Sequence, residues 1–162
     1  MSKILVNTIG HTGDTTAMTI DSTGRILQPA KPAFRAKSSS TTTFGTNTDI
    51  VFDDVTTSGC GLHNVGGHYN TSNGIFTAPI DGLYFFQFQV YQNSSTDTEV
   101  ILYLGSTELG TARNFSDGAN YDSLTLSQTL MLSATNQIKV RVVSGTAYVN
   151  ATNTSFSGFL VG

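Results

Sequence analysis

The chain has 162 residues and a formal net charge of −3, and only 12% of its residues are Asp, Glu, Lys or Arg. Typical soluble domains have about 25% charged residues. This length suits one ordinary domain with a short appendage, and the acidic balance argues against nucleic acid as a partner. Thr, Ser, Asn and Gly make up the deficit, which is typical of a turn-rich all-β protein with few helix signals.

The first 31 residues predict a short leader. Strand-like pieces at residues 4–6, 17–20 and 25–27 are separated by the turn sequences GHTGD and DSTG. They contain too little apolar surface to bury a core alone, so we expect the leader to become ordered against a partner. The opening apolar run of three residues suits neither a signal peptide nor a membrane span, which favours synthesis in a cytosol and no membrane insertion.

The sequence QPAKPA at residues 28–33 predicts an extended linker, which places a leader at 1–31 and a head at 32–162. Short strands with turn residues between them follow, and they predict a sandwich, jelly roll or closed barrel. Residues 110–122 are read as a polar stretch. The expected strands are AFRA, DIVFD, GIFTAP, LYFFQFQVYQ, EVILYLG, SLTLSQTLML, QIKVRVV, TAYVN and SFSGFLV.

The strand within GLYFFQFQVYQN, residues 82–93, poses a particular problem. Side chains alternate between its two faces, so Tyr84 and Phe86 line one face while Phe85 and Gln87 line the other. The first face is core. The second is half aromatic and half amide without one charge, which would be an aggregation hazard if it were exposed. We therefore expect another surface to cover it.

Five segments together resemble a known family. PAFRA at 32–36, IVFDDV at 50–55, HYN at 68–70, NGIFTAPIDGLYFFQFQV at 73–90 and FSGFLV at 156–161 are similar to the globular head of complement C1q and its relatives. The resemblance covers about residues 32–162 and implies a ten-strand jelly-roll β-sandwich of the tumour-necrosis-factor superfold, assembled as a homotrimer.

Two sets of head residues follow from this interpretation. The expected core consists of Phe52, Phe76, Tyr84, Phe86, Phe88, Phe156 and Leu160. The expected trimer interface consists of Phe85, Gln87, Gln89, Tyr91, Phe159 and Val161.

The leader carries a second resemblance. Its sequence SKILVNTIGHTGDTTAMTIDSTGRIL is similar to amino-terminal segments of virion proteins from tailed bacteriophages. This implies a protein made in the host cytoplasm and displayed on the virion, where the leader binds other virion proteins. The residues expected to dock it are Lys3, Ile4, Val6, Met18, Ile20, Arg25 and Leu27.

Three functions are left open. The first is a fibre or tip head that attaches to a host-surface receptor, either a glycan or a protein. The second is a capsid decoration or structural fibre component without a receptor. A secreted complement-type ligand fits least well, because the sequence shows neither collagen Gly-x-y repeats nor a secretion signal.

No enzyme motif and no cofactor motif is visible in the sequence. A weak zinc signal comes from scattered residues, for which turn or surface roles are the simpler interpretation: Asp53, Asp54, Cys60, His63 and His68. Calcium is the one metal left open, because some members of the resembled family bind it near the threefold axis. The oxygen-rich loops that would suit it contain Asp97, Glu99, Asp117 and Asp122.

Overall fold

The computed structural model describes residues 6–14, 16–56, 61–92, 96–115 and 122–162. The regular secondary structure in these ranges consists of β-strands. The chain divides into two compact units, Met1–Lys31 and Pro32–Gly162. Within the described ranges, no helix has the length and apolar character needed to cross a membrane.

The leader forms a small antiparallel sheet. Its strands are β1 (Thr8–Gly10), β2 (Thr16–Ile20) and β3 (Ile26–Leu27), in the order β1-β2-β3. The prediction of a strand at residues 4–6 is wrong for Val6, which is exposed and precedes β1. The strand begins later because the pairing with β2 starts where Thr8 meets Thr19. Ile4 lies outside the described residues.

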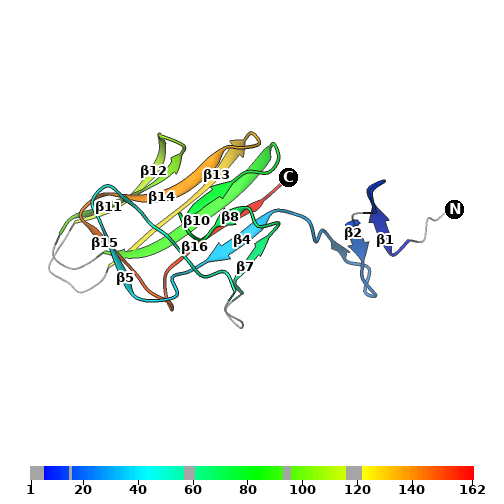
Figure 1. The fold of residues 1–162 in the computed structure, drawn as a ribbon, viewed down its shortest axis with the longest axis horizontal. Helices are drawn as coiled ribbons and strands as arrows, with labels where there is room; N and C mark the ends of the chain where they lie inside the picture. The colour runs from blue at the N-terminus through cyan, green and yellow to red at the C-terminus, as the bar shows by residue number, and fades with distance from the viewer. Residues whose placement is uncertain (1–5, 15, 57–60, 93–95, 116–121) are drawn as a thin grey trace. The chain divides into compact units, whose positions relative to one another are not determined.

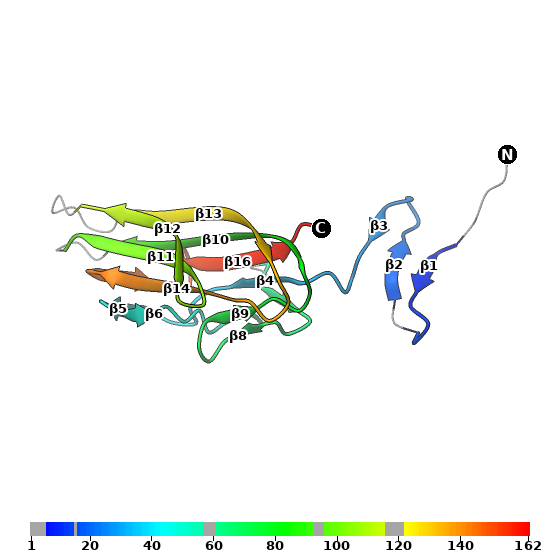
Figure 2. The same cartoon turned by 90° about the horizontal axis from the view of Figure 1, so that it is seen from above.

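The head is a two-layer β-sandwich (Figure 1). The first sheet has the order β5 (Thr42–Gly45), β15 (Thr146–Val149), β10 (Gly82–Gln92), β16 (Ser155–Leu160), β4 (Ala33–Ala36) and β7 (His63–Val65), with β13 (Ser123–Leu132) paired to β10. The second has the order β12 (Thr107–Asn114), β11 (Thr98–Leu104), β14 (Gln137–Ser144), β9 (Ile75–Thr77) and β8 (Tyr69–Asn70), with β6 (Thr48–Asp49) paired to β14. Figure 2 shows the long strands running lengthwise through the head.

Aromatic rings fill the space between the sheets. The ring of Phe34 lies 4.6 Å from that of Tyr69, centroid to centroid, and 4.9 Å from that of Phe156. Gly158 makes room for this cluster, since a Cβ there would lie 2.5 Å from Phe86 and 2.8 Å from Phe34. All seven residues expected in the core are buried: Phe52, Phe76, Tyr84, Phe86, Phe88, Phe156 and Leu160.

Two expected segments differ from the structure. The polar stretch begins with strand, because β11 and β12 form a hairpin in which Leu104 pairs with Thr107 and Gly105 adopts a positive φ of 58°. The expected strand DIVFD is strand only at Asp49, because Phe52 donates its backbone N–H to the Tyr69 hydroxyl instead of to a neighbouring strand. Because short strands such as β6 and β8 are counted, the described head has thirteen strands, where ten were expected.

Candidate functional site

The candidate site is the side of the first sheet that points away from the core, called here the outer face. It carries alternate residues of β10 together with the residues paired beside them on β13, β16 and β4. Tyr84, Phe86 and Phe88 on the opposite side of β10 are buried. Because residues paired across an antiparallel sheet point to the same side, the register defines which side chains share the outer face.

One end of the outer face is apolar. Phe85 pairs with Phe159, and their ring centroids are 5.3 Å apart. Leu83 pairs with Met131 on β13. Met131 is 74% exposed, Phe159 46% and Val161 43%. These large side chains form a contiguous apolar surface of the kind that marks a protein contact.

The middle of the outer face is polar but almost uncharged. Gln87 lies between Ser127 on one side and Ser157 on the other. Ser157 is followed in the same row by Arg35, and Gln89 pairs with Ser155. Hydroxyl and amide groups can hydrogen-bond a partner without the desolvation cost of an ionised side chain.

The far end of the outer face is aromatic and hydroxylated. Tyr91 pairs with Tyr148 of β15 and, on its other side, with Ser123 of β13. The structure thus brings Phe85, Gln87, Gln89, Tyr91, Phe159 and Val161 onto one continuous surface. The sequence interpretation missed Met131 and Tyr148, which only the strand register could have added.

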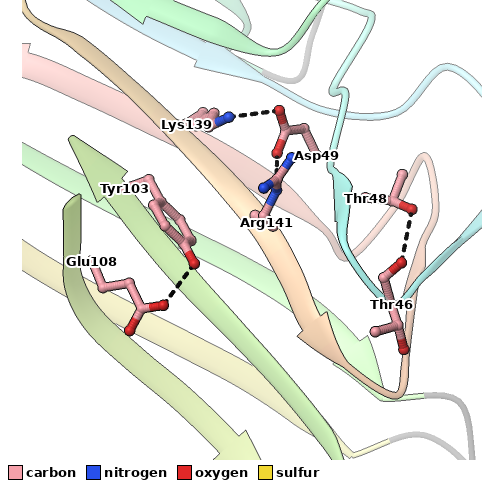
Figure 3. Close-up of polar contacts among 7 residues, drawn as sticks. All are labelled: Thr46, Thr48, Asp49, Tyr103, Glu108, Lys139 and Arg141. Atoms are coloured by element: carbon pink, nitrogen blue, oxygen red, sulfur yellow. Dashed lines mark hydrogen bonds and ion pairs between the residues drawn. The ribbon is translucent and has the colours of Figure 1, made fainter. Parts of the chain in front are cut away.

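The outer side of the second sheet has the opposite character (Figure 3). Asp49 accepts hydrogen bonds from Lys139 Nζ at 2.8 Å and Arg141 Nε at 2.5 Å. The Tyr103 hydroxyl donates to Glu108 Oε1 at 2.8 Å, and this bond is the main cause that raises the Tyr103 pKa. Covering these charges with a partner would cost desolvation, so this side suits contact with water.

The two carboxylates of the weak zinc signal have other partners. Asp53 accepts hydrogen bonds from the Ser39 backbone and hydroxyl, and Asp54 accepts two from Thr56. Burial would raise the pKa of Asp53, but the Ser39 hydrogen bonds lower it below its ordinary value. Within the described ranges, no three His, Cys, Asp or Glu side chains gather as a metal site. Cys60 lies outside those ranges.

The acidic residues considered for calcium do not form such a group either, within the part of the chain that is described. Asp122 accepts a hydrogen bond from Asn114 Nδ2 at 2.7 Å. Asp117 lies outside the described residues.

The leader residues expected to dock are only partly described, because Lys3 and Ile4 fall outside the described ranges. Val6 is 39% exposed and Leu27 49%, while Met18 and Ile20 are both half-buried in β2. Arg25 forms an ion pair with Asp21 at 2.6 Å. Ile26, which the sequence interpretation did not include, is 63% exposed and adds to the apolar surface.

Fold and site together define a class of protein: an antiparallel jelly-roll β-sandwich with a charged outer side on one sheet and an apolar and amide outer face on the other. The C1q domain model matches residues 33–161. The chain belongs to the C1q domain family.

Solved structures agree on the fold. The globular domain of the zebrafish complement 1qA protein superposes with a TM-score of 0.64 at 18% identity, covering 82% of this chain and 98% of that one. The Eiger TNF of S. frugiperda superposes with a TM-score of 0.62 at 12% identity, covering 82% and 94%. The likeness to C1q and TNF expected from the sequence is therefore confirmed at the level of the fold.

Proposed function

We propose that this chain is a non-enzymatic structural protein that works as a homotrimer, with the outer faces of three heads packed around a threefold axis. The observation that carries this proposal is the outer face itself. It exposes Met131, Phe159 and Val161 at one end and continues through uncharged amides and hydroxyls. Interface centres are enriched in aromatic residues and Met and depleted in charge, which is the composition found here.

The contrast between the two sheets indicates which of them packs against neighbouring subunits. Asp49, Lys139 and Arg141 satisfy one another on the second sheet, where a partner would have to desolvate three charges. On the first sheet, burial of Phe85 and Phe159 gains hydrophobic free energy with little polar cost. The first sheet is therefore the one that packs against neighbours.

The proposed setting is the virion of a tailed bacteriophage. Its support is the resemblance of residues 2–27 to leaders of phage virion proteins, together with the apolar side chains that the leader exposes at Val6, Ile26 and Leu27. In this proposal the leader binds other virion proteins, either by strand addition or by winding with the other two leaders of the trimer. The head is then displayed outside the particle as a fibre or tip domain.

The role proposed for the head is attachment to a host-surface receptor. Three identical heads on one axis would convert weak individual sites into tight binding. The alternative is a capsid decoration or fibre component that stabilises the particle and binds no receptor. Comparing binding of the purified head to host and non-host cells separates these two roles.

Truncation tests whether the leader docks the protein to the virion while the head forms the trimer and binds any receptor. A chain that begins at Pro32 is expected to form trimers and to keep any receptor binding, because the leader and the head are separate compact units. It is expected to be absent from purified virions when it replaces the full chain. Normal incorporation of the truncated head would show that the leader is not the docking element.

A further inference from the structure

The register of the leader sheet divides its side chains between two faces. Ile9 pairs with Met18, and Ile20 pairs with Ile26. Paired residues point to the same side of a sheet, and residues two apart in one strand also share a side. These four side chains therefore lie together on one side, called here the apolar face of the leader.

The opposite face of the leader sheet has a different character. Thr8, Thr19 and Leu27 form one paired row across the three strands, and Ala17 lies on the same side of β2 as Thr19. Two of these side chains carry hydroxyl groups and a third is a single methyl group, so water can cover this face at little cost. The leader is therefore amphipathic, with its large aliphatic side chains mostly on one face.

The apolar face has no second layer within the described leader. Ile26 is 63% exposed and Ile9 45%, while Met18 and Ile20 are half-buried. The leader sheet is a single layer of three short strands, and a sheet with one apolar face is stable only when another element covers that face. None of the four side chains is ionisable, so a partner could cover them without desolvating a charge.

The short connection between leader and head indicates which partner is available. β3 ends at Leu27 and β4 begins at Ala33, so the chain between them spans at most about 20 Å. A turn in which the Lys31 N–H donates to the Gln28 carbonyl at 3.1 Å shortens this span. Short tethers hold linked modules at effective concentrations of about 1 mM, which a free partner would have to match. In the proposed homotrimer, the nearest apolar faces are those of the other two leaders.

The tether also begins beside the proposed trimer contact. Ala33 pairs with Phe159, and the Pro32 carbonyl accepts a hydrogen bond from the Leu160 N–H at 2.9 Å. Phe159 belongs to the outer face, through which the heads are proposed to pack. The three tethers therefore leave their heads at positions that the trimer brings together, and contact between the leaders would continue the proposed interface.

Given the homotrimer proposed above, on which this step rests, we infer that the apolar face of each leader packs against the apolar faces of the other two leaders. The occupants are thus two further copies of the same segment. Ile9, Met18, Ile20 and Ile26 from three chains form a small shared core, which supplies the apolar burial that one leader lacks. β1 and β3 remain the edges of each leader sheet, so strand addition is the mode left for binding other virion proteins.

Hydrogen exchange of the full-length protein, read by mass spectrometry on leader peptides, tests this packing. The amides of β2 are expected to exchange slowly in the trimer. Ile26→Gln replaces an aliphatic side chain on the apolar face and is expected to speed this exchange by at least about tenfold. The matched control is Leu27→Gln, which changes the next residue of β3, 49% exposed on the opposite face, and is expected to leave the exchange unchanged.

Light scattering on the same samples separates the leaders from the heads. Ile26→Gln is expected to keep the mass of a trimer, because the outer faces of the heads still pack. A wild-type monomer would contradict the trimer itself, whereas a wild-type trimer with fast exchange in β2 would overturn only the packing of the leaders.

The variant Phe159→Ser, diluted until it is monomeric, distinguishes the remaining occupant. Its leader is expected to lose the slow exchange of β2 together with the trimer. Slow exchange that persists in this monomer would show that the leader is covered by its own head. That result, or an equal effect of Ile26→Gln and Leu27→Gln, would overturn the inference.

Discussion

The apolar end of the outer face offers the sharpest perturbation, the substitution Phe159→Ser. Phe159 is 46% exposed in the isolated chain. A Phe side chain carries about 200 Å² of surface, so a neighbour that covered the exposed part would bury about 90 Å². At about 25 cal/mol per Å², this burial stabilises the trimer by about 2.3 kcal/mol per subunit and about 7 kcal/mol in all.

The loss of this burial energy should weaken the trimer by a measurable amount. About 7 kcal/mol corresponds to about five powers of ten in the trimer dissociation constant. Because that constant scales with the square of the concentration, the concentration at which half the trimer dissociates should rise about 300-fold. Sedimentation velocity over a dilution series measures this concentration directly.

The matched control is Phe115→Ser. Phe115 is 64% exposed and follows β12 in the second sheet, so its loss removes an exposed aromatic ring without touching the outer face. We expect it to leave trimer dissociation unchanged. An equal shift in both variants, or none in Phe159→Ser, would refute the assignment of the outer face as the interface.

Three further predictions concern the packing, metal dependence and pH dependence of the protein. Gly158→Ala should lower the free energy of unfolding by about 1–3 kcal/mol in urea denaturation, because its Cβ would overlap the rings of Phe86 and Phe34; an unchanged midpoint would contradict the packing described. Addition of a chelator should leave the melting temperature unchanged, and a fall of many degrees would point instead to a structural metal ion. The turn between β2 and β3 should lose its order as pH falls below about 4 toward 2. The Asp21 pKa is lowered to about 2, mainly by the hydrogen bond from the Thr23 hydroxyl and next by the one from the Arg25 backbone, so the ionised carboxylate stabilises the turn at higher pH. NMR shifts of Thr23 and Arg25 that stay constant to pH 2 would contradict this prediction.

The sequence predicted the parts of the fold that follow from local alternation. In β10 the two faces differ residue by residue, so the buried side of Tyr84 and Phe86 and the outer side of Phe85 could be separated without a structure. β12 could not be predicted in this way, because its sequence TELGTARN has no apolar period. Its position follows from the hairpin at Gly105 and from pairing with β11.

The candidate sites depend on register, which the sequence does not encode locally. Met131 lies among alternating leucines, and only its pairing with Leu83 shows that it belongs to the outer face. A hollow of about 300 Å³ on the outer face is lined by Arg35, Tyr91 and Asn153 from β4, β10 and the turn before β16, segments far apart in the chain. No spacing rule could have brought these three residues together.

The mass of the full-length protein in solution tests the central proposal most directly. Each chain weighs 17.2 kDa, so light scattering behind a sizing column at micromolar concentration should report three times that mass, about 52 kDa. A trimer of this mass that dissociates when Phe159 is replaced by Ser would support packing through the outer face. A well-folded species of 17.2 kDa at the same concentration would contradict it.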